Sequence, residues 1–239
     1  MFEKMIHLDK RLEERGEMGY FSEKFFSFFE ELSLNNNKDW FHAHKKTYED
    51  FIKKPFEQLV EELIDMIREE EPDLDIEPKD AIFRINRDIR FSKDKTPYKT
   101  HVGASIKKGG KKSPNSPGFY VHLSSDSAMV GGGVYGLETK DLYRIRKHIA
   151  QSLNEFSKVL EDKNFRKKYG SLKGEKNQRI PKEFQEALKK QPLIANKHFL
   201  YTTKLDPEII LEPDLPDQLM DYYRAGTHIN DFFQTALRS

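Results

Sequence analysis

Hydrophobic residues in the first third of the chain recur every three or four positions, which is the spacing of amphipathic helices. Three stripes of this kind follow one another, at residues 21–32, 40–51 and 56–67. Asn37 or Asp39 has a side chain that can accept a hydrogen bond from the first turn of the second helix. The pattern therefore predicts a helical beginning to the fold.

After Pro78 the apolar positions alternate with polar ones, which is the pattern typical of short strands. The strands expected from it cover residues 82–91, 100–107, 119–124, 128–135 and, much later, 199–205. Residues 108–117 are rich in Gly, Lys, Ser and Pro, which predicts a hairpin that joins Ile106 to Phe119. The middle of the chain is therefore expected to form an antiparallel meander.

Helical spacing returns after the meander. We expect helices over residues 141–160, directly after Pro181, and over residues 216–237, with a polar loop over residues 163–182. Helices, then strands, then helices predict an α+β fold whose central antiparallel sheet of short strands is packed by N-terminal and C-terminal helices. No repeat or linker divides the sequence, so residues 21–239 are expected to form a single α+β domain behind a polar N-terminal extension of residues 1–20.

Composition removes several classes of function. The chain has no cysteine, which excludes disulfides, thiolate metal sites and cysteine nucleophiles and favours a cytoplasmic location. Charged residues make up 34% of it, and no apolar run approaches the roughly 20 residues that span a bilayer. We therefore expect a soluble cytoplasmic protein without a membrane partner.

Charge is distributed unevenly, although the net charge is only +1. Residues 49–80 hold 13 acidic side chains against 4 basic ones, whereas residues 84–112 hold 10 basic against 2 acidic. The two segments either neutralise each other in the fold or leave a basic face that attracts anions. The near-neutral total makes nucleic acid a less favoured partner than a small phosphorylated ligand.

The most informative run is residues 83–100, in which aromatic and aliphatic side chains alternate with cations. On an ideal strand Arg87 falls on the apolar face beside Ile85 and Ile89. Burying an unpaired guanidinium is costly. Three arrangements resolve this conflict: a bulge near Asn86 rotates the strand, a carboxylate meets Arg87 inside, or Arg87 lines a cavity.

The same run suits the binding of an anion. The planar fork of an arginine grips a phosphate or carboxylate through two parallel hydrogen bonds. We assign ligand binding to Arg84, Arg87, Arg90, Lys93, Lys95 and Tyr98, with the tyrosine shaping the pocket. The alternative is an internal network of Arg–Asp pairs that ties the sheet to the helices, in which case the protein is a structural or interaction module.

An enzyme that processes phosphoesters or nucleotides is a third hypothesis. Asp88 or Asp94 would hold a divalent ion or act as a base, and His101 or His122 would move a proton. The two histidines share a sheet face if their strands pair. No HExxH or comparable ligand spacing occurs, so no residue is assigned to a protein-bound metal. Gly131-Gly132-Gly133 matches no phosphate loop and is explained by close packing of the sheet or by a ligand against bare backbone.

These motifs resemble the family known as domain of unknown function 2461. The resemblance rests on residues 35–41, on residues 83–99, and on residues 118–120 through Gly131-Gly132-Gly133, and it covers roughly residues 21–237. It implies where a site lies, but it brings no established activity, substrate or catalytic residue.

Overall fold

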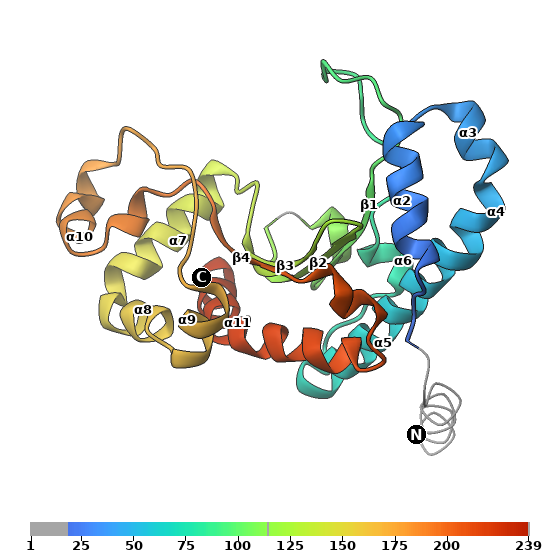
Figure 1. Cartoon of the computed structure of the whole chain (residues 1–239). Helices are drawn as coiled ribbons and strands as arrows, with labels where there is room; N and C mark the ends of the chain where they lie inside the picture. Colours follow the sequence, from blue (N-terminus) through green and yellow to red (C-terminus); the bar gives the residue numbers. More distant parts are fainter. Residues whose placement is uncertain (1–18, 114, 239) are drawn as a thin grey trace.

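The computed structural model describes residues 19–113 and 115–238, and the extension predicted over residues 1–20 lies almost wholly outside them. The centre of the fold is an antiparallel sheet with the strand order β1-β2-β3-β4 (Figure 1). The strands are β1 (His101–Ile106), β2 (Gly118–Ser124), β3 (Ala128–Val134) and β4 (Phe199–Leu205). This sheet and the helices around it confirm the predicted α+β fold.

Helices surround the sheet in two groups (Figure 1). The first group comprises α2 (Lys24–Leu34), α3 (Lys38–Ala43), α4 (Lys45–Tyr48), a π-helical turn (Glu49–Lys53), α5 (Lys54–Glu70) and α6 (Pro78–Ala81). The second group comprises α7 (Thr139–Gln151), α8 (Leu153–Leu160), α9 (Lys163–Tyr169), α10 (Gln185–Lys190) and α11 (Leu215–Arg238). Short 3₁₀ turns lie at Gly110–Lys112, Lys182–Phe184, Pro192–Ala195 and Pro207–Leu211.

Three predicted helices or loops differ from those observed. The second predicted helix is divided into α3, α4 and the π-helical turn. The helix predicted over residues 141–160 is divided between α7 and α8 at Ser152. The stretch predicted as a polar loop contains α9, because Asp162 accepts a hydrogen bond from the N–H of Phe165 at 2.8 Å and the rings of Phe165 and Tyr169 are buried.

One face of the sheet is covered by helices, with α11 packed against β2 and β3 and α5 against β1 (Figure 1). Alternate strand residues point toward this face and are buried, among them Val102, Ala104, Ile106, Phe119, Val121, Leu123, Val130, Phe199 and Tyr201. Helix α11 meets them with a buried apolar stripe that includes Leu219, Tyr223, Ile229 and Phe233. Because side chains alternate along a strand, the remaining strand residues point to the opposite face.

Close packing between α11 and the sheet accounts for the glycines of β3. Gly132 faces the buried Tyr201, whose hydroxyl donates to the carbonyl of Gly226 in α11 at 3.2 Å. A Cβ atom at Gly132 or Gly226 would collide with this hydroxyl. Gly133 has φ +97°, a conformation that glycine adopts without strain, and its N–H donates to Asn230 of α11 at 3.2 Å. Of the two explanations given for the glycines, sheet packing is observed at Gly132.

Candidate ligand-binding site

Residues 82–100 form a long irregular hairpin that leads into β1 and rises beside α2 (Figure 1). Its two arms are joined where Arg87 N donates to Pro97 O and where Lys99 N donates to Ile85 O, each at 2.9 Å. These two bonds make one isolated bridge, between Asn86 and Tyr98, instead of a ladder. The strand predicted over residues 82–91 is therefore wrong, because this segment pairs mainly with its own return arm.

Exposed and half-buried residues nevertheless alternate along the first arm, as predicted. Arg84, Asn86, Asp88 and Arg90 are exposed, whereas the residues between them are half-buried. The alternation ends at Phe91, because the chain turns at the tip of the hairpin and leaves this apolar residue 96% exposed. The hairpin therefore presents its cations on one side and packs its apolar residues on the other.

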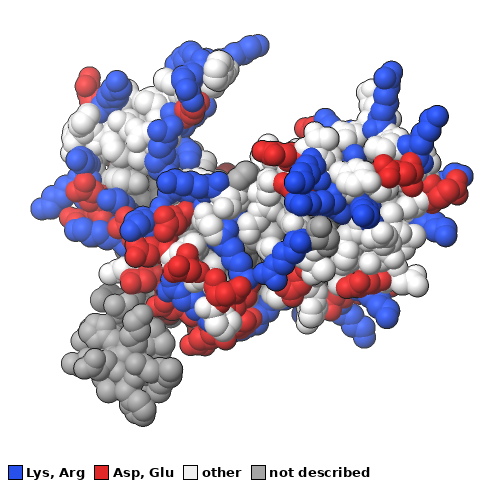
Figure 2. All heavy atoms as spheres, turned by 180° about the vertical axis from the view of Figure 1, so that it is seen from behind, with Lys and Arg blue, Asp and Glu red and all other residues white. Residues whose placement is uncertain are grey.

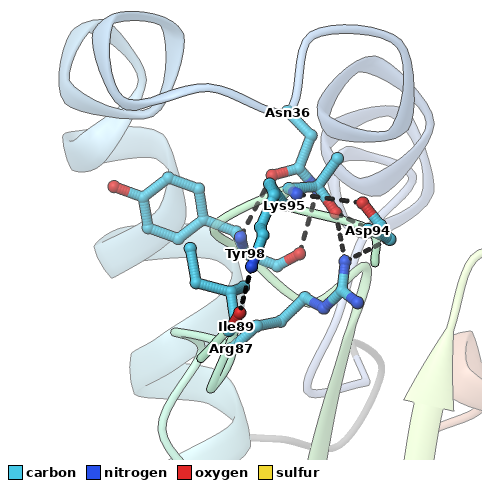
Figure 3. Close-up of polar contacts among 7 residues, drawn as sticks. Asn36, Arg87, Ile89, Asp94, Lys95 and Tyr98 are labelled. Atoms are coloured by element: carbon cyan, nitrogen blue, oxygen red, sulfur yellow. Dashed lines mark hydrogen bonds and ion pairs between the residues drawn. The ribbon is translucent and has the colours of Figure 1, made fainter. Parts of the chain in front are cut away.

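Arg87 is fastened inside the hairpin (Figure 3). Its Nη1 donates to the carboxylate of Asp94 and to the hydroxyl of Thr96, and its side chain is only 26% exposed. The N–H of Thr96 also donates to Asp94 at 2.9 Å; this bond first, and that from Arg87 next, lower the pKa of Asp94 to about 2. Lys95 Nζ donates to the carbonyl of Ile89 at 2.9 Å. Of the three arrangements considered for Arg87, a carboxylate partner is the one observed.

Arg90 lies at the surface near the tip of the hairpin. Its Nε and Nη2 donate to the carboxylate of Asp88 at 3.0 and 2.7 Å, and these bonds lower the pKa of Asp88 to about 2. The side chain of Arg90 is 77% exposed, so water screens the pair. Arg84 and Lys93 are exposed as well. These three cations can therefore reach a ligand without breaking the contacts that hold the hairpin together.

The base of the hairpin is attached to the N-terminal helices through Asn36. Its Nδ2 donates to the carbonyl of Tyr98 at 2.9 Å, and its Oδ1 accepts from the N–H of Tyr98 at 3.1 Å (Figure 3). The buried ring of Tyr98 stacks on Phe41 of α3 with the ring centroids 4.0 Å apart. Tyr98 therefore lies in the core and holds the hairpin in place, rather than lining a pocket as expected.

The face of the sheet opposite α11 is hollowed. A cavity of about 570 Å³, here called the sheet-face cavity, lies over it. Its lining includes Phe83 of the hairpin, Lys107, Tyr120 of β2, Tyr135, and Leu200 and Thr202 of β4. Strand register places Ser105, Tyr120, Gly131 and Thr202 side by side across the floor. Figure 2, seen from behind, shows Lys and Arg side chains around the hollow between the hairpin and the opposite group of helices.

Two half-buried lysines stand next to this cavity. Lys107 lines it, and Lys99 Nζ lies 5.4 Å from the centre of the Phe83 ring. Burial lowers the pKa of both amines, and the charge of Arg84 lowers that of Lys99 further. Within residues 19–113 and 115–238, neither ammonium is paired with a carboxylate or a hydrogen-bond acceptor. The cavity therefore has a cationic side that the fold leaves uncompensated.

A row of titratable side chains continues along the same face. His101 and His122 stack with ring centroids 4.1 Å apart, which confirms that they share a sheet face. The hydroxyl of Tyr120 lies 3.2 Å from Nδ1 of His122. Burial, and next the charge of His122, lowers the pKa of His101 to about 4; burial also lowers the pKa of His122. Both imidazoles therefore favour the neutral form near pH 7, and each is a weaker base than a free imidazole.

Across the part of the chain that the structure describes, no three His, Asp or Glu side chains gather as a metal site. The same residues include no helix that is both long and apolar enough to cross a bilayer. Asp88 and Asp94, the two candidate carboxylates, are both engaged in the hairpin pairs.

Fold and site together define an α+β protein with an antiparallel sheet, of which one face is packed and the other is open beside a basic hairpin. Residues 24–232 match the family described as "Conserved hypothetical protein (DUF2461)", and the chain belongs to this family. The match extends from the start of α2 into α11 and so includes the hairpin and all four strands. The comparison with curated proteins gives no match. The family confirms the resemblance drawn from the motifs and attaches no reaction to it.

Replacing Asn36 with Ala should destabilise the protein by about 1–3 kcal/mol, because the buried N–H and C=O of Tyr98 both lose their partner. Urea unfolding measures the change. Asn35→Ala, at an exposed neighbouring position, is the matched control and should have a much smaller effect. Equal stability of the Asn36→Ala variant and the parent would contradict the role given to Asn36.

The pKa of His101, read from an NMR titration of its ring protons, should lie near 4. The unfolded chain binds this proton near an ordinary value of about 6.5, so protonation favours unfolding. Stability contributed by this group is therefore complete above that value and is lost as the pH falls toward 4. His101→Gln should flatten the pH dependence of unfolding in this window. An unchanged dependence would show that His101 is not desolvated as described.

Proposed function

We propose that this protein binds a small phosphate-containing anion in the sheet-face cavity, to whose lining the basic hairpin contributes Phe83. The observation that carries the proposal is the pair Lys99 and Lys107, which are partly removed from water beside the cavity and have no anion within the described residues. A desolvated cation without a partner costs stability. Costs of this kind are concentrated at functional sites, and a bound anion would supply the missing charge.

The hairpin adds positive charge around the cavity. Residues 84–99 contain six basic side chains and two acidic ones. Arg84, Arg90 and Lys93 are exposed and give the field that attracts an anion. Arg87 and Lys95, which were assigned to the ligand from sequence, act in this proposal by fixing the shape of the hairpin. A phosphate suits such a site because its several oxygens can accept hydrogen bonds from more than one cation.

A catalytic role is the second candidate, and one observation favours it. The row of Tyr120, His122 and His101 stands on the same open face as the cavity, and Tyr120 belongs to both. Imidazole is the side chain most often used for proton transfer, and a bound phosphate would raise the lowered pKa values toward the working pH through its negative charge. A phosphatase and nuclease screen with added Mg²⁺ and Mn²⁺ tests this role. Turnover by the parent protein that is lost in His122→Ala would support a catalytic role. No turnover with any substrate would count against catalysis and leave the binding function. The absence of cysteine keeps the cytoplasm as the proposed location.

Replacing Lys107 with Met should separate binding from stability. Methionine keeps the long stem and removes the charge, so affinity for inorganic pyrophosphate, measured by isothermal titration calorimetry, should fall about tenfold or more. The free energy of unfolding should stay the same or rise, because an unpartnered desolvated ammonium is removed.

Lys112→Met is the matched control, since Lys112 is exposed on the 3₁₀ turn that follows. It should leave pyrophosphate affinity within about twofold of the parent, because water screens its charge. Equal loss of affinity in the two variants would point to a general effect of net charge, and unchanged binding in Lys107→Met would contradict the proposed site.

A further inference from the structure

The walls of the sheet-face cavity are aromatic as well as cationic. Phe83 and Tyr120 form one wall, with ring centroids 6.4 Å apart and ring planes inclined by 57°. Tyr135, just after β3, also lines the cavity and is 63% exposed. Leu200 adds aliphatic surface from β4. An inorganic anion has no use for this apolar surface, so the lining indicates a ligand with a hydrophobic part.

Part of the floor is bare backbone. Gly118 of β2 and Gly133 of β3 are direct cross-strand partners on the open face. Neither position has room for a Cβ atom, because neighbouring backbone and side-chain atoms stand too close. Both glycines line the cavity and carry no side chain, so they offer peptide surface against which a planar group can lie.

Two hydroxyl groups on this floor make no hydrogen bond within the described residues. Ser105 stands opposite Tyr120 in the strand register, and Thr202 stands opposite Gly131. Both line the cavity, and within the described ranges neither side-chain hydroxyl takes part in a hydrogen bond. A few polar groups among apolar walls are typical of sites that orient a small organic ligand.

We infer that the ligand is a nucleoside phosphate, with its base against Phe83, Tyr120 and Tyr135 and its phosphate toward Lys99 and Lys107. This inference rests on the proposed function and adds the chemistry of the second half of the ligand. Every nucleobase has a flat face that stacks on aromatic side chains. The volume of about 570 Å³ lies within the range of small-ligand pockets. A sugar phosphate alone would leave the aromatic wall unused.

A series of related ligands tests the inference by isothermal titration calorimetry on the full chain at one salt concentration. The probes are AMP, GMP, CMP, UMP, ribose 5-phosphate and adenosine. The best mononucleotide should bind about tenfold or more tightly than ribose 5-phosphate, because base stacking adds to phosphate binding. Adenosine should bind more weakly than AMP, because it lacks the group that pairs with the lysines.

The outcomes distinguish failure of the nucleoside inference from failure of the proposed anion site. Equal binding of ribose 5-phosphate and all four mononucleotides would overturn the nucleoside inference and keep the anion site. Absence of binding by every phosphate would overturn the proposed function itself. Adenosine binding as tightly as AMP would show a ring site in which the lysines take no part, and would overturn the inference as stated.

Tyr135 provides the matched variants, because its exposed position tolerates truncation. Tyr135→Ala should lower mononucleotide affinity about tenfold with ribose 5-phosphate unchanged, and Tyr135→Phe should keep it, since the ring remains. Tyr143→Ala, at another exposed tyrosine on α7, should have no effect. If Tyr135→Ala binds mononucleotides as tightly as the parent, the ring of Tyr135 does not contact the base.

The same chemistry can come from a free nucleotide or from single-stranded nucleic acid, and a further arm distinguishes them. A bounded cavity and a net charge of only +1 favour the free nucleotide. A hexanucleotide should then bind no more tightly than a mononucleotide and with a shallow dependence on salt. Much tighter, steeply salt-dependent binding of the hexanucleotide would overturn the assignment to free nucleotide.

Discussion

Asn36 holds the backbone of Tyr98 by two hydrogen bonds, and the position of the basic hairpin depends on this contact. The clamp joins two motifs that lie 62 residues apart in sequence, and stacking of Tyr98 on Phe41 completes the joint. The bonds of Arg87 to Asp94 and Thr96 then close the hairpin above it. With its base and its arms fixed, the hairpin has a defined position, and Phe83 at its start lines the cavity.

Much of the fold follows from spacing along the chain. The bounds of β4 agree with the alternation at residues 199–205, and β1 to β3 agree within one or two residues. The shared face of His101 and His122 was predictable too, because neighbouring strands in a meander pair. The strand predicted over residues 82–91 was wrong because alternation indicates only which side of a segment is buried. It does not indicate whether a partner strand is present.

The cavity itself could not be predicted, for a physical reason. Its floor depends on which residues stand opposite one another, and a slip of one residue in register would turn Tyr120 into the core. From the sequence, Lys107 and Tyr135 each looked like the last residue of a strand. Only the packing of one sheet face by α11 shows that the other face is open. The motif of residues 84–99 lies next to Phe83 of the cavity lining, but two of its cations, Arg87 and Lys95, hold the hairpin together.

The central claim is that the ammonium of Lys107 is partly desolvated and unpaired in the free protein, and that a bound anion pairs with it. NMR of ¹³Cε-labelled lysine, assigned with the Lys107→Met variant, measures the pKa of this amine directly. The account predicts a value below the ordinary one of about 10.4 in the free protein, and a rise when pyrophosphate is added. An ordinary pKa that does not respond to pyrophosphate would contradict it.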